Sequence, residues 1–206
     1  MDYIRATVTI EGTAPMSQSH MHGENKLEGE THDDYDIRTW RSKLNVETVN
    51  GKETVVIPAF GLQTAIADAA KYSKRQIPGQ GKATWTAKFT AGISVLAPVA
   101  LNIDPATVRP VTINANSDGI RGSGKRVLRR FPQIAPGWKA TFDVIILDPI
   151  ITKEIFQEML ELAGLFVGIG QFRPQKGGTN GRFVVGAIDW RDNRREVPNA
   201  RPKMAA

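Results

Sequence analysis

The segment from residue 139 to residue 190 constrains the fold most, because it combines a strand, a helix and a second strand. "KATFDVIIL" (139–147) is rich in the β-branched and aromatic residues that favour strands. In "DPIITKEIFQEMLELAG", Thr152 is the expected N-cap and Gly164 the expected C′ residue. The apolar stripe between them consists of Ile155, Phe156, Met159, Leu160 and Ala163. "RFVVGAIDW" (182–190) then predicts a second strand.

The same types of element occur earlier in the chain. "YIRATVTI" (3–10) predicts a strand, and "ATWTAKFTAGISVLAP" (83–98) alternates well enough to predict another. Between them, residues 59–74 carry a helical stripe of Leu62, Ile66, Ala69 and Ala70. The order strand, helix, strand, strand, helix, strand predicts an α+β fold, the ferredoxin-like or RRM-like βαββαβ unit. Its sheet is antiparallel, and both helices cover one face.

Two long excursions interrupt this order. Residues 11–36 are polar and show neither a helical nor a strand period. Residues 104–137 contain four prolines and four glycines, so we expect little regular structure there. Residues 37–58 look like a hairpin, with Asn50-Gly51 as a type I′ turn. We therefore expect one domain over residues 1–190 with inserts at 11–36 and 104–137, followed by a basic flexible tail at 191–206.

The distribution of charge points to a polyanionic partner. The net charge is +6, but residues 1–58 hold ten acids against six bases, a net charge of −4. The remaining residues hold 21 bases and 11 acids, a net charge of +10. Such asymmetry favours a nucleic-acid-binding surface built from the later segments, and the alternative is a basic, solvated face without a ligand. The absence of cysteine excludes disulfides, thiol catalysis and zinc-thiolate sites.

The densest basic patch is "RGSGKRVLRR" (121–130), which has no acidic residue. Its cations, which could neutralise phosphates without reading sequence, are Arg121, Lys125, Arg126, Arg129 and Arg130. Phe131 and Trp138 flank the patch and could stack on bases or anchor the segment to the core. The alternative is a flexible, solvated loop.

A second basic segment, "GLFVGIGQFRPQKGGTNGRFVV" (164–185), is rich in glycine. We expect Gly168 and Gly170 on one face of a strand, where a side-chain-free surface would admit another backbone. The turn around Gly178 could present exposed N–H groups to an anion, and phosphate contacts would come from Arg173, Lys176 and Arg182. The spacing is not the dinucleotide fingerprint, because here the helix precedes the glycines. The alternative is a β-bulge followed by a hairpin turn.

The three histidines His20, His22 and His32 lie close in sequence to three aspartates, Asp33, Asp34 and Asp36. Imidazoles and carboxylates together could bind a divalent metal or act as acid and base in RNA cleavage. The alternative is that these side chains are simply solvated. No specific hydrolase signature is present in the sequence.

These features together resemble the RAMP superfamily of CRISPR-associated RNA-binding proteins, and most closely the backbone subunits that polymerise along guide RNA. "VIPAFGLQTAIADAAK" (56–71) is similar to the Ile-Pro-small-x-Leu helix start of that family. The glycine-rich segment is similar to its C-terminal Gly-x-Gly-x-x-Arg…Gly-Arg-Phe segment. The insert at 104–137 lies where backbone subunits carry a thumb that pins the RNA.

The resemblance implies an RNA-binding, self-assembling subunit without a cofactor, with other CRISPR subunits as further partners. It assigns Arg121, Lys125 and Arg126 to the thumb, and it assigns to the glycine-rich loop the residues Gly168, Gly170, Arg173, Gly178 and Arg182. Some such subunits cut target RNA with an aspartate after the first strand, for which Asp33 and Asp34 are the candidates. Because 206 residues is short for a backbone subunit, a compact viral or mobile-element relative is an alternative.

Three hypotheses follow, in this order. The first is a non-catalytic subunit that binds single-stranded RNA or DNA and assembles with copies of itself. The second is a structural protein of a filament or particle, in which the basic segment contacts an acidic segment of the next copy. The third is a ribonuclease that uses the loop at 20–36. No apolar run approaches the roughly 20 residues that span a bilayer, so we expect a cytoplasmic protein without a membrane partner.

Overall fold

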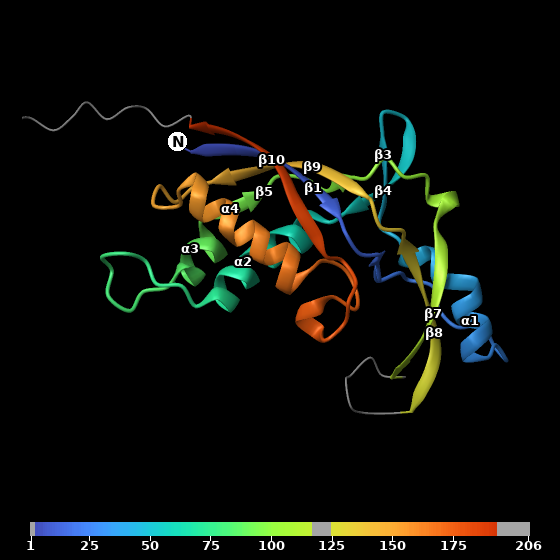
Figure 1. Ribbon diagram of the computed structural model, residues 1–206. Helices are drawn as coiled ribbons and strands as arrows, with labels where there is room; N and C mark the ends of the chain where they lie inside the picture. The colour runs from blue at the N-terminus through green and yellow to red at the C-terminus, as the bar shows by residue number, and fades with distance from the viewer. Residues whose placement is uncertain (1–2, 117–124, 193–206) are drawn as a thin grey trace, which may run out of the picture.

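The protein is built around a four-stranded antiparallel sheet, seen in a computed structural model that describes residues 3–116 and 125–192 (Figure 1). The strand order is β10-β1-β9-β5, and every neighbouring pair is antiparallel. The strands are β1 (Ile4–Gly12), β5 (Ile93–Val95), β9 (Lys139–Ile146) and β10 (Phe183–Asp192). This order, with the first strand between the last and the third, confirms the predicted α+β fold of the βαββαβ type.

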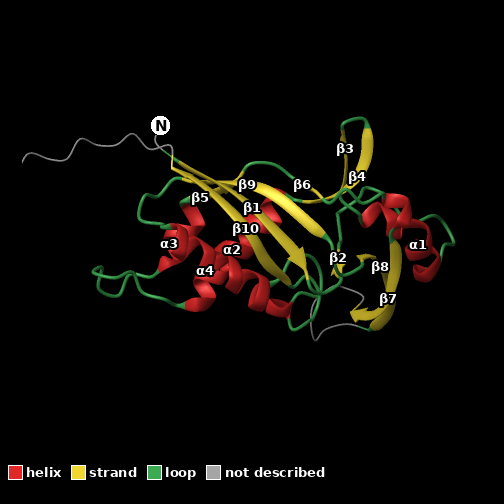
Figure 2. Ribbon diagram, turned by 45° about the horizontal axis from the view of Figure 1, so that its top comes forward, coloured by secondary structure: helices red, strands yellow, loops and turns green. Residues whose placement is uncertain are grey.

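Three helices cover one face of this sheet (Figures 1 and 2). They are α2 (Ala59–Ser73), α3 (Trp85–Ala91) and α4 (Lys153–Leu162). Alternation along β1 sends Ile4, Ala6, Val8 and Ile10 towards the helices, and all four are buried. The Thr152 hydroxyl accepts a hydrogen bond from the Ile155 amide, which confirms the predicted N-cap of α4. None of the described helices is both long and apolar enough to cross a membrane.

A group of smaller elements lies beside one end of this core. A second sheet has the order β2-β8-β7, and a third has the order β3-β4-β6. Their strands are β2 (Met16–Ser17), β3 (Val46–Val49), β4 (Lys52–Ile57), β6 (Val99–Ala100), β7 (Arg109–Asn116) and β8 (Arg126–Ile134). Helix α1 (His32–Thr39) and the 3-10 turn η1 (Trp40–Lys43) pack against β8. Asn50 and Gly51 have φ of 51° and 78°, so the predicted tight turn joins β3 to β4.

The prediction of a strand over residues 83–98 is wrong for most of its length. Residues 85–91 form α3, and only β5 is extended. Trp85 and Phe89 are both buried, and their spacing of four residues fits a helical period as well as a strand period. Contacts with α2 select the helix, which periodicity alone could not do.

The insert at 104–137 is also more regular than we predicted. Strands β7 and β8 pair from Arg109↔Gln133 to Asn116↔Arg126 and form a long hairpin, which we call the finger. Pro110 does not prevent it, because this proline lies on the edge strand β7, where a missing amide is tolerated. Residues 117–124, which include Arg121, lie outside the described residues.

Helix α4 does not end in the way we predicted. The chain continues through a π-helical turn, η3 (Ala163–Val167), and the left-handed residue that follows is Gly168, with φ of 70°. A Cβ at Gly164 would collide with the backbone of Phe183, so this glycine allows the turn to lie directly against β10. Helix α4 and the turn η3 therefore place the start of the glycine-rich stretch at the edge of the core.

Candidate nucleic-acid interface

Residues 168–182, which we call the glycine-rich loop, are not the strand that we predicted. Gly168 and Gly170 both have positive φ, and the segment turns repeatedly. A Cβ on Gly170 would collide with the carbonyl oxygen of Ser17, in β2. The space that a side chain would take at Gly170 is therefore filled by the chain's own backbone.

The amides of the predicted anion-binding turn are also used internally. Gly178 N donates to Arg173 O (3.1 Å), Asn180 N to Phe172 O (2.9 Å) and Gly181 N to Pro15 O (2.7 Å). Because these N–H groups already have partners, they are not the anion nest that the sequence suggested. Glycine is required here for compactness, since a Cβ at Gly178 would collide with the backbone of Phe172.

The finger and the glycine-rich loop nevertheless meet. The rings of Phe131 (β8) and Phe172 (loop) pack edge to face, with centroids 5.1 Å apart. The short strand β2 lies between the finger and the loop. Its Ser17 pairs with Gln133 of β8 on one side and forms a β-bridge with Gln171 of the loop on the other. The two segments are therefore held side by side by one short strand, as the nucleic-acid hypothesis requires.

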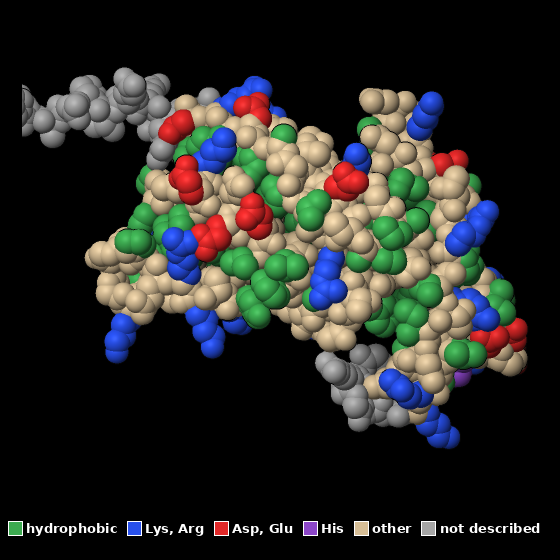
Figure 3. All heavy atoms as spheres, viewed as in Figure 1, with side chains coloured by type: hydrophobic (Ala, Val, Ile, Leu, Met, Phe, Trp, Pro, Cys, Tyr) green, Lys and Arg blue, Asp and Glu red, His purple; other side chains and the backbone are tan. Residues whose placement is uncertain are grey.

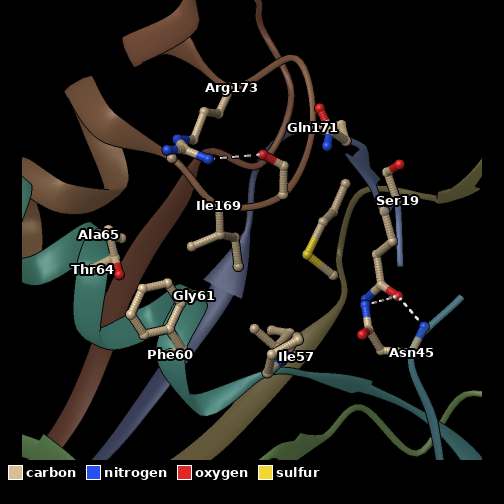
Figure 4. Close-up of a pocket in the computed structure, with 15 residues that line it drawn as sticks. Ser19, Asn45, Ile57, Phe60, Gly61, Thr64, Ala65, Ile169, Gln171 and Arg173 are labelled. Atoms are coloured by element: carbon tan, nitrogen blue, oxygen red, sulfur yellow. Dashed lines mark hydrogen bonds between the residues drawn. The ribbon is translucent and has the colours of Figure 1, made fainter. Parts of the chain in front are cut away.

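A pocket of about 240 Å³ opens where the loop meets the start of α2 (Figure 4). We call it the α2 pocket; its walls include Gln18, Asn45, Phe60, Gly61, Ile169 and Arg173. The buried Gln18 side chain donates to Val56 O (2.8 Å) and accepts from Asn45 N (2.8 Å), so it braces one wall. The pocket joins the two segments on which the family resemblance rests, residues 56–71 and 164–185.

The α2 pocket has features that suit an anionic, aromatic ligand. The Phe60 side chain is 78% exposed and Arg173 lies across from it, as Figure 4 shows. The Arg173 guanidinium is positioned by Gln175 Oε1, at 3.0 and 3.1 Å. The described lining contains no acidic residue, and the first turn of α2 contributes the positive end of a helix dipole.

The two inner cations of the finger are already neutralised by α1. Asp33 binds the Arg130 guanidinium, and the buried Asp36 carboxylate lies 3.4 Å from Arg129 Nε and accepts from the Arg130 amide. Lys43 Nζ completes the network by donating to Asp36 (2.8 Å) and to Arg130 O (2.7 Å). Arg129 and Arg130 therefore hold α1 against the finger.

This network explains two shifts in basicity. Burial lowers the pKa of the Lys43 ammonium from its ordinary value, although Asp36 acts in the opposite direction. The hydrogen bond to Asp33 raises the pKa of the Arg130 guanidinium. By contrast, Lys125 and Arg126 at the outer end are exposed, and no ion pair involves either of them within the described part of the chain.

The candidate catalytic residues are engaged in structural contacts. Asp33 pairs with Arg130, while Asp34 Oδ2 accepts from the Thr31 hydroxyl at the N-cap of α1. Neither lines the α2 pocket. Among the described residues, no three His, Asp or Glu side chains come together in a way that could hold a metal ion.

The remaining predicted cations lie around the glycine-rich loop. Lys176 ends the short 3-10 turn η4 (Pro174–Lys176) and is exposed. Arg182 is half-buried, and its Nε donates to Leu165 O (3.2 Å), beside the π-helical turn. In Figure 3 lysine and arginine side chains project along the lower edge, from the helical side to the finger. Acidic side chains lie higher on this face or on its α1 side.

The open face of the main sheet has a different character. Its charges are paired across strands, as Arg5 with Asp143 (2.5 Å) and Lys139 with Glu11 (3.2 Å). Thr9 and Thr141 are in hydrogen-bond contact between them (3.1 Å). No aromatic side chain of the four described strands alternates to this face. On this face the four strands therefore offer no ring for a base to stack on, unlike the strands of RRM sheets.

Phe60, which lines the α2 pocket, was not among the residues predicted from the sequence. The available signal was its place on α2, opposite the buried Leu62 stripe, where a large aromatic side chain is unusual. Gln18 and Asn45 gave no such signal, because each is an ordinary polar residue until the fold joins them.

Comparisons with known proteins bear on the fold. No protein-family model matches the chain, and no curated protein matches it. A chain of a type IV-B CRISPR complex has a TM-score of 0.50 and 9% identity, covering 98% of this chain and 95% of its own length. A chain of a type III-B Cmr-β complex bound to cognate target RNA has a TM-score of 0.49 and 14% identity over 93% of this chain.

This chain spans 62% of the length of that Cmr-β chain. Cmr6 from Pyrococcus furiosus has a TM-score of 0.48 and 12% identity, covering 89% of this chain and 98% of its own length. At such low identity the likeness concerns the fold alone. The chain therefore shares its overall α+β fold with a chain of the type IV-B CRISPR complex.

Proposed function

We propose that this chain is a non-catalytic subunit of a CRISPR-type ribonucleoprotein that binds single-stranded nucleic acid, with RNA as its preferred ligand. The observation that carries the proposal is the meeting of the finger and the glycine-rich loop beside the α2 pocket. The fold shared with a chain of a type IV-B CRISPR complex is consistent with membership of such an assembly.

In this proposal the nucleic-acid strand runs along the exposed side of the finger and of the glycine-rich loop. Lys125 and Arg126 contact phosphates from the finger, and Arg173 contacts them from the pocket side. Phe60 offers an exposed ring to a base, which any nucleobase can use. Lys176 and Arg182 remain predicted contacts, as does Arg121, which lies outside the described residues. Binding of this kind tolerates sequence, because phosphates and ring faces carry little sequence information.

The aspartates of α1 form contacts within the chain, and these contacts bear on the structural-protein and ribonuclease hypotheses. Because Asp33 and Asp36 already neutralise the chain's own arginines, they are less available to dock a basic segment of the next copy. Because Asp33 and Asp34 lie away from the α2 pocket, they are poorly placed to cut a strand held there. Both points favour assembly along a nucleic acid without cleavage.

The test of binding is the salt dependence of affinity for a labelled single-stranded RNA, measured by fluorescence anisotropy. The variant carrying Lys125→Ala, Arg126→Ala and Arg173→Ala should bind more weakly. Its slope of log affinity against log salt should be shallower by about 2, at about 0.7 per lost phosphate contact. Arg5→Ala, Lys139→Ala and Arg191→Ala together form the matched control, with the same charge change on the open sheet face. Equal affinities of both triple variants and the unaltered protein would contradict the proposed site.

Self-assembly is tested separately by light scattering after chromatography. With RNAs of increasing length, the number of copies bound should rise in proportion to length. Nuclease treatment should return the protein to small species, whereas particles that survive the nuclease would favour the structural-protein hypothesis. Replacing RNA by DNA of the same sequence tests whether 2′-hydroxyls contribute.

A further inference from the structure

A second exposed aromatic feature lies at the far end of α2. The rings of Tyr72 and Phe166 stack with centroids 5.1 Å apart and an interplanar angle of 24°. Tyr72 is 59% exposed and Phe166 is 40% exposed, and the neighbouring Leu165 is 55% exposed. A pair of rings that is already stacked and still exposed offers a flat apolar surface to a third ring.

This stacked pair is aligned with the α2 pocket. Gly61, Thr64, Asp68 and Tyr72 follow one another at steps of three or four residues, so they share one stripe of α2. Gly61 and Thr64 line the pocket, and Asp68 accepts a hydrogen bond from Gln175 of the glycine-rich loop (2.8 Å). The stripe therefore leads from the pocket, past the loop, to the rings. At 1.5 Å per residue, Gly61 and Tyr72 lie about 16 Å apart along the helix.

Cations accompany the rings. The bond from Arg182 Nε to Leu165 O holds this guanidinium beside the segment that carries Phe166. Lys71, next to Tyr72, is exposed, and no ion pair involves it within the described part of the chain. Asp68 is the acidic member of the stripe, and its carboxylate accepts a hydrogen bond from the Gln175 side chain. A flat apolar surface flanked by cations matches a nucleotide, which has a base to stack and a phosphate to neutralise.

We propose that Tyr72 and Phe166 form a second nucleobase platform, on which a base of the same single strand stacks after the strand leaves the α2 pocket. This inference rests on the proposed function, because it needs a strand in the pocket. A stacked strand rises about 3.4 Å per nucleotide, so some five nucleotides separate the two sites. Arg182 neutralises a phosphate at the platform.

The experiment uses a ten-nucleotide single-stranded RNA, long enough to reach both sites. Tyr72→Leu keeps an apolar side chain but removes the ring, and Tyr72→Phe keeps the ring as the matched control. Loss of one stacked base should weaken binding roughly 5- to 140-fold for Tyr72→Leu, with little change for Tyr72→Phe. Ultraviolet crosslinking followed by peptide mass spectrometry should find RNA attached at Tyr72 or Phe166.

Phe166→Leu is the second variant, and thermal melting of each protein shows whether it is folded. If Tyr72→Leu fails to fold, the RNA affinity of Phe166→Leu and the crosslinked positions test the platform instead. Binding by the unaltered protein with no loss in either Leu variant and no crosslink at the platform would overturn this inference alone. Absence of any single-strand binding by the unaltered protein would overturn both proposals. Loss of RNA-free oligomers with unchanged RNA affinity would make the rings a protein interface, which also overturns the inference.

Discussion

The glycine-rich loop and the finger lie side by side, but they are held by different forces. The loop is held by backbone hydrogen bonds such as Gly181 N to Pro15 O, and by contacts that only glycine permits. The inner end of the finger is held by charge, through Asp36 and Lys43. Backbone hydrogen bonds and the buried Asp36–Lys43 pair respond weakly to salt, whereas the more exposed Asp33–Arg130 pair is screened by it.

This difference shows that a basic stretch of sequence is not the same as a basic surface. The five cations of residues 121–130 looked equivalent in the sequence. Among those that the structure describes, Arg129 and Arg130 pair with acids of α1, while Lys125 and Arg126 are exposed. In the loop, glycines that promised an open surface instead bring the chain's own segments together.

The largest effect should come from Asp36→Ala. Removing this buried carboxylate leaves Lys43 without its counter-ion and takes a partner from the Arg130 amide, which should cost about 3–5 kcal/mol of unfolding free energy. Urea denaturation measures it. Asp34→Ala is the control, since the hydrogen bonds of that exposed residue go to the Thr31 cap in the part of the chain that the structure describes, and it should cost within about 0.5 kcal/mol. Equal costs would show that charge does not hold the finger.

Gly181→Ala should destabilise the loop by about 2–3 kcal/mol. Gly181 has φ of 72°, and a Cβ there would collide with the carbonyl oxygen of Ile169, so strain and a clash add together. The free energy of unfolding at low and at high salt is the measurement, and the loss should be the same in both. Gly23→Ala, which has open space, should be neutral. A strongly salt-dependent loss would break the contrast between the two regions.

Arg126→Ala should weaken RNA binding more than Arg129→Ala. Arg126 is exposed, whereas Arg129 is engaged by Asp36. We expect a salt slope shallower by about 0.7 for Arg126→Ala and little change for Arg129→Ala. Anisotropy titrations of the two variants on one RNA give both slopes. The reverse ranking would mean that α1 releases Arg129 when RNA binds.

The smallest expected effect is a loss of stability at acid pH through Glu30. Hydrogen bonds from Arg38 and from the Leu27 amide lower the pKa of Glu30 to about 2. Because the folded pKa lies below the ordinary value of 4.5, Glu30 contributes stability that is present above pH 4.5 and lost as the pH falls towards 2. Unfolding free energies across this range should fall less steeply for Glu30→Gln. Parallel curves would show that this carboxylate does not couple folding to pH.

Much of the fold could be predicted because local patterns specify it. The Thr152 cap, the Asn50-Gly51 turn and the buried stripe of α4 each depend on neighbours within a few residues. The same locality explains the error at residues 83–98, where Trp85 and Phe89 satisfy two periods at once. The nucleic-acid-binding residues stay a prediction. The α2 pocket, which brings residues 57–65 together with residues 168–173, was not predicted, because these segments meet only in the fold.

By itself, the sequence determined the order of the four core strands and of helices α2 and α4, the N-cap of α4, the Asn50-Gly51 turn and the total charge of each segment. Only the tertiary structure decided which cations are neutralised, which glycines contact backbone and where an aromatic ring is left exposed. The physical reason is the sequence separation of the residues that interact. Periods, caps and turns arise from neighbours in sequence, whereas Asp36 meets Arg130, and Gly170 meets Ser17, only after distant segments pack together.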